Sequence, residues 1–180
     1  MIQRLPGVRR SGTRPGATTC PKARGSDRKE LGNVEAWEIE ARLSIQATMS
    51  RYTRYVDAGR PDQLSLLFAD PMYYDMGGGR VVHTRAELIA TVEEIKSTFR
   101  AADDFGRLRH HVSSVNIELT GPDSAKATSY FLALAGAGPD HWGVYRDELT
   151  RVDQGWLFSR RTVTVEGASA ISPVRSEVVG

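Results

Sequence analysis

The pattern of apolar positions divides the chain into a helical first half and a strand-rich second half. From residue 34 to 58 apolar side chains recur every three or four residues, as on one face of a helix: Ile45, Met49, Tyr52 and Val56. Pro61 is placed to open a short second helix, and Thr84 with Glu87 has the spacing of a capping box for a third. A short strand over 72–76 is expected between them.

The second half predicts a sheet. Tight-turn signals separate four long segments of strand character, over 107–120, 124–135, 141–152 and 156–165. Long strands joined by short turns form an antiparallel meander. We therefore expect an α+β domain in which a cone-shaped, curved antiparallel sheet wraps around three N-terminal helices and encloses a pocket.

The first long strand carries the most suggestive chemistry. Successive side chains of a strand point to opposite faces, and the apolar residues Val115, Ile117 and Leu119 mark the buried face. Unbroken alternation then puts His111 on the buried face and His110 on the outer one. A histidine at the end of an apolar face, beside a loop, is suited to carry protons, although it could equally be a core residue held by one hydrogen bond.

Composition and charge set the limits of the folded domain. Residues 1–33 carry eight Lys and Arg against two Asp and Glu, whereas the remainder, with 16 against 20, is mildly acidic. The first 33 residues show no helical or strand period and predict a disordered basic leader. We expect the folded domain over 34–166 and a C-terminal tail over 167–180. Because the basic charge belongs to the leader, no nucleic-acid partner is expected.

Two further features bear on location. No apolar run approaches the roughly 20 residues that span a bilayer, so no membrane association is expected. Cys20 is the only cysteine, which excludes an internal disulfide and a cysteine-based metal site. The sequence therefore predicts a cytoplasmic protein.

Three segments together resemble the SnoaL-like group of the nuclear transport factor 2-like superfamily. They are YVDAGRPDQLSLLFAD at 55–70, HHVSSVNIEL at 110–119 and YRDELTRVDQGWLFSRR at 145–161. The resemblance covers residues 35–166 and implies the same helices-then-curved-sheet fold. The group includes dehydratases, isomerases, cyclases and dehydrochlorinases, as well as proteins that only bind small molecules, so the fold alone does not give the activity.

The resemblance also implies site residues. In scytalone dehydratase-type and hexachlorocyclohexane dehydrochlorinase-type members, an Asp at the end of the first helix pairs with a His at the start of the first long strand. These positions match Asp57 and His111. The dehydrochlorinase type implies a cavity arginine at Arg161, but its cationic cavity residue falls at Tyr52, which argues against dehydrochlorination. The dehydratase type implies tyrosines beside the site, for which the candidates are Tyr73 or Tyr74, with Tyr52 as a further one.

These residues predict a cofactor-independent lyase or isomerase. Asp57 would fix the tautomer of His111, which would act as general base, while tyrosine hydroxyls and Arg161 would hold a developing oxyanion or a leaving group. The expected ligand is a small apolar, aromatic or otherwise cyclic molecule, which loses water or undergoes a double-bond shift. No cofactor and no metal are expected, since His83 and His141 add no ligand spacing.

Several alternatives stay open. The chain could be a non-catalytic small-molecule-binding protein or the small subunit of a ring-hydroxylating dioxygenase. Arg161 could form a structural ion pair with Asp147 or Glu148 on the neighbouring strand. A homodimer or homo-oligomer through the open face of the sheet is expected from the resemblance.

Overall fold

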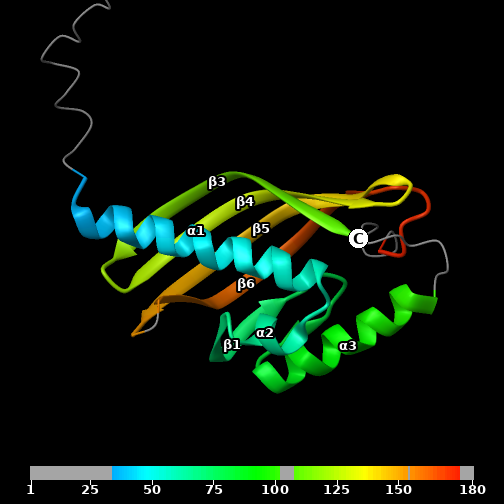
Figure 1. Ribbon diagram of the computed structural model, residues 1–180, viewed down its shortest axis with the longest axis horizontal. Helices are drawn as coiled ribbons and strands as arrows, with labels where there is room; N and C mark the ends of the chain where they lie inside the picture. Colours follow the sequence, from blue (N-terminus) through cyan, green and yellow to red (C-terminus); the bar gives the residue numbers. More distant parts are fainter. Residues whose placement is uncertain (1–33, 102–107, 154, 175–180) are drawn as a thin grey trace, which may run out of the picture. The chain divides into compact units, whose positions relative to one another are not determined.

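The computed structural model describes residues 34–101, 108–153 and 155–174, and the expected leader lies outside them. From Glu35 onward these residues belong to one compact unit. Its elements, in chain order, are α1 (Ala36–Asp57), α2 (Pro61–Ser65), β1 (Phe68–Asp75), β2 (Val81–Val82), α3 (Arg85–Ala101), β3 (Arg109–Gly121), β4 (Ser124–Ala135), β5 (Gly138–Val152) and β6 (Gly155–Ala168) (Figure 1).

Helix α1 begins and ends where its sequence provides caps. Glu35 and Glu38 form a reciprocal capping box that satisfies backbone N–H groups of the first turn. The helix buries the expected face, which includes Ile45, Met49 and Tyr52. It ends at Asp57, and Gly59 then takes a positive φ of 60°, which costs glycine little. Asp57, which carries a carboxylate, is therefore the last residue of α1.

The strands form one open sheet in the order β2-β1-β6-β5-β4-β3. Strands β3 to β6 form the expected antiparallel meander, with bounds close to those predicted. Strand β1 pairs with β6 in parallel, so the sheet as a whole is mixed. This pairing joins residues about ninety positions apart and brings Tyr74 beside Arg161.

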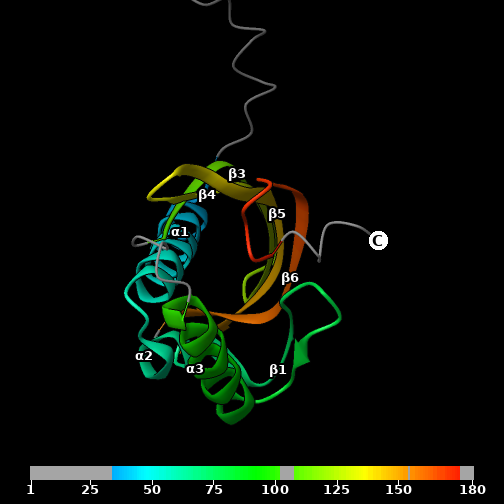
Figure 2. The same ribbon diagram turned by 90° about the vertical axis from the view of Figure 1, so that its right-hand side faces the viewer.

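The sheet curves around the helices. Figure 2 shows the strands bending round the side on which α1 and α3 lie. Helix α1 packs against both β3 and β6, and α3 packs against α2 and β1. The concave face carries the core, whose centre is a cluster of aromatic rings: Tyr52, Phe68, Tyr74, Phe131, Tyr145 and Phe158. The expected α+β fold with a curved sheet wrapped around helices is confirmed.

A β-bulge interrupts β3 and changes which side chains face the core. Ser113 pairs with Tyr130 and Asn116 with Thr128, so β3 has one residue more than β4 between these pairs. Ser114, inside the bulge, has a φ of 50°, in the left-handed region. Alternation therefore changes phase at this point, and Ile117 on one side of the bulge shares the inner face with His110 on the other.

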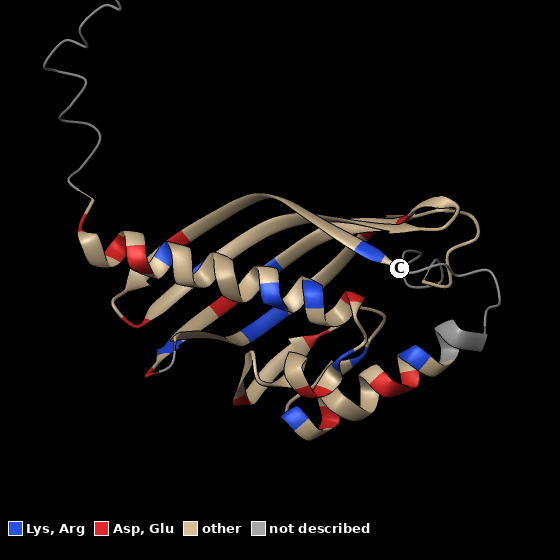
Figure 3. Ribbon diagram, viewed as in Figure 1, with Lys and Arg blue, Asp and Glu red and all other residues tan. Residues whose placement is uncertain are grey.

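Two surface properties complete the description. Basic and acidic residues are interspersed along α1 and along the described part of α3, so neither helix presents a surface of a single sign (Figure 3). Among the described residues, no helix combines the length and the apolar character needed to cross a membrane.

Candidate active site

A cavity of about 350 Å³ lies on the concave side of the sheet. Its walls come from α1, α3, β1 and the inner face of the meander, and residues after β6 also contribute. Most of its lining is apolar or aromatic, including Val56, Ile95, Phe131, Val163 and Val165. The polar groups in it are few, and they converge from separate elements, which is typical of ligand sites.

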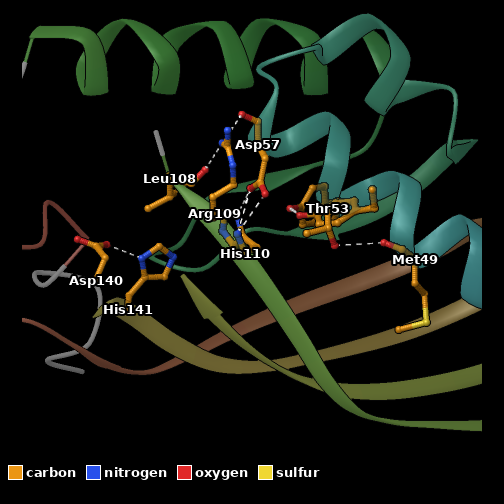
Figure 4. A network of polar contacts seen from close by, with 10 residues as sticks. Met49, Thr53, Asp57, Leu108, Arg109, His110, Asp140 and His141 are labelled. Carbon is orange, nitrogen blue, oxygen red and sulfur yellow. Dashed lines mark hydrogen bonds and ion pairs between the residues drawn. The ribbon is translucent and has the colours of Figure 1, made fainter. Parts of the chain in front are cut away.

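The first polar group is a carboxylate–histidine pair formed by Asp57 and His110 (Figure 4). His110 Nδ1 lies 2.7 Å from Asp57 Oδ1, and the backbone N–H of His110 donates to both carboxylate oxygens at 3.2 Å. An ionised carboxylate only accepts, so Nδ1 carries the proton and Nε2 is the nitrogen left to the cavity. Both side chains are mostly buried, at 10% and 14% exposure.

These hydrogen bonds explain how a carboxylate is tolerated at the end of α1. The negative end of the helix dipole disfavours an anion there. Donors from the start of β3 offset this, because the strand begins directly against the helix end. Arg109 strengthens the junction: its Nη1 donates to the Leu108 carbonyl at 2.8 Å and lies 3.5 Å from the Asp57 carbonyl oxygen.

The predicted pairing of Asp57 with His111 is wrong. His111 lies on the outer face of β3 and is exposed, whereas His110 lines the cavity. The reason is the bulge at Ser114, which shifts the alternation by one residue between Ile117 and the two histidines. The polar run Ser113-Ser114 inside an otherwise regular strand is the signal in the sequence, but nothing in it fixes where the extra residue is placed.

The sequence reasoning also missed a second carboxylate–histidine pair. His141 Nδ1 lies 2.6 Å from Asp140 Oδ2, and His141 lines the same cavity. The His110 and His141 rings are 5.8 Å apart, since both residues are register partners of Ala133 on the strand between them. The two histidines therefore lie on the same face of the sheet, on β3 and β5, with β4 between them. Sequence spacing alone does not reveal this, because it depends on cross-strand register.

Two of the three candidate tyrosines lie at the cavity. Tyr52 and Tyr74 line it and share a hydrogen bond between their hydroxyls. Tyr73 is on the opposite face of β1, where the Arg160 guanidinium lies 3.9 Å from its ring centre. Of Tyr73 and Tyr74, Tyr74 is therefore the one that lines the cavity, and Tyr145, which the sequence did not single out, lines it too.

Arg161 lies beneath the tyrosines rather than in the lining of the cavity. It is 1% exposed, and its Nε and Nη2 donate to the two oxygens of Asp147 at 2.7 Å. Its guanidinium carbon is 3.8 Å from the Tyr52 ring centre and 4.5 Å from that of Tyr145. Arg161 therefore forms the structural ion pair across β5 and β6 and supports the rings that form the cavity wall.

Burial sets the ionisation of these groups. It raises the pKa of Tyr74 and of Tyr145 well above the ordinary tyrosine range, and the neighbouring Tyr52 raises both further, while Arg161 partly offsets the effect. Burial alone would lower the pKa of the Arg161 guanidinium, but the charge and hydrogen bonds of Asp147 outweigh it and raise the pKa. Tyr74 and Tyr145 therefore remain neutral donors at neutral pH.

Strand β6 continues to Ala168, inside the expected tail, and the chain after it contributes to the cavity wall. We call residues 169–174 the C-terminal segment. The Ser169 N–H donates to the Asp140 carbonyl at 2.7 Å, and the Ser172 hydroxyl donates to Asp140 Oδ2 at 2.8 Å. Pro173 and Val174 line the cavity. Within the described ranges, no three His, Cys, Asp or Glu side chains gather to hold a metal ion.

Comparison with known proteins places this geometry in context. A family profile described as a SnoaL-like domain matches residues 37–162. Among curated protein sequences, none matches the chain significantly.

Solved structures share the fold at low sequence identity. A protein from Novosphingobium aromaticivorans, provisionally named a scytalone dehydratase, is 23% identical with a TM-score of 0.66, covering 80% of this chain and 96% of its own. LinA is 18% identical with a TM-score of 0.65, covering 75% of this chain and 93% of its own. ActVI-ORFA from Streptomyces coelicolor is 21% identical with a TM-score of 0.60, covering 69% and 96%.

Proposed function

Because the chain belongs to the SnoaL-like domain family, we propose that it is a cofactor-independent lyase or isomerase in which His110 is the general base. The observation that carries the proposal is the Asp57–His110 pair, which presents one ring nitrogen to a largely apolar cavity. The role inferred for His111 from the sequence passes to His110, its neighbour. The substrate class is a small cyclic molecule that carries a carbonyl group.

The chemistry begins with proton abstraction from carbon. With Nδ1 held by Asp57, Nε2 of His110 accepts a proton from a carbon next to the carbonyl group, and the Asp57 carboxylate stabilises the imidazolium that forms. Negative charge then develops on the carbonyl oxygen. The hydroxyls of Tyr52 and Tyr74 share one hydrogen bond, so one of the pair keeps an O–H free to donate to that oxygen, in a site that largely excludes water.

From this enolate two outcomes follow. Where the substrate already has a carbon–carbon double bond next to the enolate, return of the proton to a carbon further along moves that double bond. Where the neighbouring carbon carries a hydroxyl group, departure of that group together with one proton eliminates water. Both outcomes use the same first step, so a test of that step does not require the natural substrate.

The experiment measures exchange of α-hydrogen for deuterium in cyclohexanone, followed by NMR in deuterated buffer with the full chain. We expect exchange above the buffer rate, and a loss of about 100-fold or more in His110→Gln, since general bases contribute about 10²–10⁴-fold. The matched control is His111→Gln, which changes the neighbouring, outward-facing histidine and should leave the rate unchanged.

Equal rates for wild type, His110→Gln and Asp57→Asn would contradict the proposal. That result would favour the alternative of a non-catalytic binding protein or oxygenase subunit, in which function does not depend on Asp57.

The protein is further proposed to form a homodimer through the outer face of the sheet. Tyr130 on β4 and Trp142 on β5 are 57% and 42% exposed there. Sedimentation equilibrium should give the mass of two chains, and Trp142→Ser should shift it toward one chain. A single-chain mass for the wild type would contradict the dimer.

A further inference from the structure

We propose that His141 is a second proton-transfer residue of the cavity, and that Ser172, acting through Asp140, is its positioning residue. This inference rests on the proposed function and adds to it a proton donor for the leaving group. In it, His110 removes the proton from the substrate carbon, and His141 donates a proton to the oxygen of the leaving group.

The first support is the arrangement of the two pairs. In each histidine, Nδ1 lies within hydrogen-bond distance of a carboxylate oxygen, at 2.7 Å for His110 and 2.6 Å for His141. Both rings line the same cavity. The carboxylates approach from different directions, Asp57 from the end of α1 and Asp140 from β5 itself (Figure 4). A carboxylate that holds Nδ1 fixes the tautomer and directs Nε2 away from itself.

The second support is the degree to which Asp140 is constrained. It is only 2% exposed, and its Oδ2 accepts from both His141 Nδ1 and the Ser172 hydroxyl. Ser172 is itself buried and its hydroxyl also accepts the backbone N–H of Val174. Burying a carboxylate is costly unless donors compensate it, and here the two donors both compensate the burial of Asp140 and fix the orientation of its carboxylate.

The third support is where these contacts come from. The C-terminal segment both positions Asp140 and supplies Pro173 and Val174 to the cavity wall. The segment that helps to form the cavity wall therefore also contacts the carboxylate that holds His141.

The proposed step balances as follows. His110 Nε2 takes the proton from the carbon next to the carbonyl group, and the electron pair left on that carbon forms the double bond. The bond between the adjacent carbon and its hydroxyl oxygen breaks. Protonated His141 gives its Nε2 proton to that oxygen, and water leaves. His110 ends protonated and His141 neutral, and exchange of one proton with solvent restores both.

The test compares two compounds that differ by one hydroxyl group. Cyclohexanone reports carbon exchange alone, and 3-hydroxycyclohexanone reports loss of water by the absorbance of the enone. In the full chain, His141→Gln should lower dehydration about 100-fold and leave exchange within a few-fold, whereas His110→Gln should lower both. If His141→Gln dehydrates at the wild-type rate while His110→Gln does not, the inference is overturned and the proposed function stands.

The positioning role has its own variants. Ser172→Ala should lower dehydration about tenfold, as expected for one hydrogen bond to a charged group, and Ser172→Thr should restore it. The matched control is Ser169→Ala, because the buried Ser169 hydroxyl has no hydrogen-bond partner among the described residues. Equal loss in both alanine variants would mean a general effect on the segment and would overturn the role of Ser172.

A readout without substrate separates the two proposals. The imidazole Nδ1–H proton of His141 should give a slowly exchanging NMR signal in the wild type and in Ser169→Ala, and the signal should broaden or vanish in Ser172→Ala while that of His110 persists. An unchanged His141 signal in Ser172→Ala overturns the positioning role. If wild type acts on neither compound, the proposed function and the catalytic role of His141 fall together, and this signal still decides the role of Ser172.

Discussion

At the scale of single residues, the site depends on groups whose charge state is set by burial. Tyr74 and Tyr145 are 3% exposed, and burial raises the pKa of each. Neutral phenols can donate hydrogen bonds to a developing oxyanion, whereas phenolates cannot. The same burial that builds the cavity wall therefore extends the pH range over which Tyr74 and Tyr145 stay neutral.

Stability at high pH should reveal these raised pKa values. Below about pH 10 neither folded nor unfolded tyrosine ionises, so the full stability is present. Above that pH the unfolded state loses protons first, and the free energy of unfolding should fall by up to about 1.4 kcal/mol per pH unit for each buried tyrosine. Urea unfolding between pH 8 and 11 should show this fall, and Tyr74→Phe should make it shallower. An identical slope in the variant would contradict the assignment.

The Arg161–Asp147 pair gives a second prediction at this scale. Arg161→Met leaves the Asp147 carboxylate, which is fully buried, without its partner and should cost about 3–5 kcal/mol. Replacing both residues, as Arg161→Met with Asp147→Leu, removes the unpaired charge and should recover most of the loss. Urea unfolding of the three proteins measures this. If the double variant is no more stable than Arg161→Met alone, the loss does not come from the unpaired charge of Asp147, and the prediction is contradicted.

At the scale of elements, β3 shows how far sequence reasoning reaches. The helices and the bounds of the meander strands follow from periodicity and turn residues, because these are local properties. The strand expected over 72–76 instead begins at Phe68, because its parallel pairing with β6 is a long-range contact. The inward position of His110 does not follow from local properties either, because it depends on one extra residue at Ser114 that only pairing with β4 defines. The place of Asp57 at the end of a helix is local, so the sequence predicts it. The place of His141 beside His110 depends on pairing across β4, so the sequence does not predict it.

The bulge itself can be tested. Ser114 has a positive φ that glycine adopts without steric cost, so Ser114→Gly should stabilise the protein by up to about 1 kcal/mol. Ser114→Val, with a β-branched side chain, should destabilise it by at least as much. The control is Ser113→Gly in the regular part of the strand, which should be destabilising. Urea unfolding measures all three, and a destabilising Ser114→Gly would contradict the bulge at this position.

At the scale of the whole molecule, the core cluster of the described residues belongs to one unit of the chain. Every member of the core cluster lies between Ala41 and Phe158, within the unit that begins at Glu35. The cavity is likewise lined by residues from Tyr52 to Val174. At this scale the sequence predicts the fold class and the presence of a pocket. It does not predict which segments line the pocket, because these segments meet only through long-range contacts.

A shortened chain tests this independence. A chain that begins at Val34 should unfold within about 2 °C of the full chain, since a change of about 0.5 kcal/mol shifts the melting temperature by that amount in a domain of this size. Calorimetry of both chains gives the comparison. A large loss of melting temperature would show that the first 33 residues contribute to the fold.

The parallel pairing of β1 with β6 has a consequence for synthesis. On the ribosome, α1, α2 and β1 emerge early, but β1 has no long partner until β6 follows, after all the rest of the sheet has been made. The aromatic centre, with Phe68 against Phe158, is incomplete until then. Strand β1 therefore lacks its parallel partner, and Phe68 lacks Phe158, until β6 has been made, so this part of the core can form only late in synthesis.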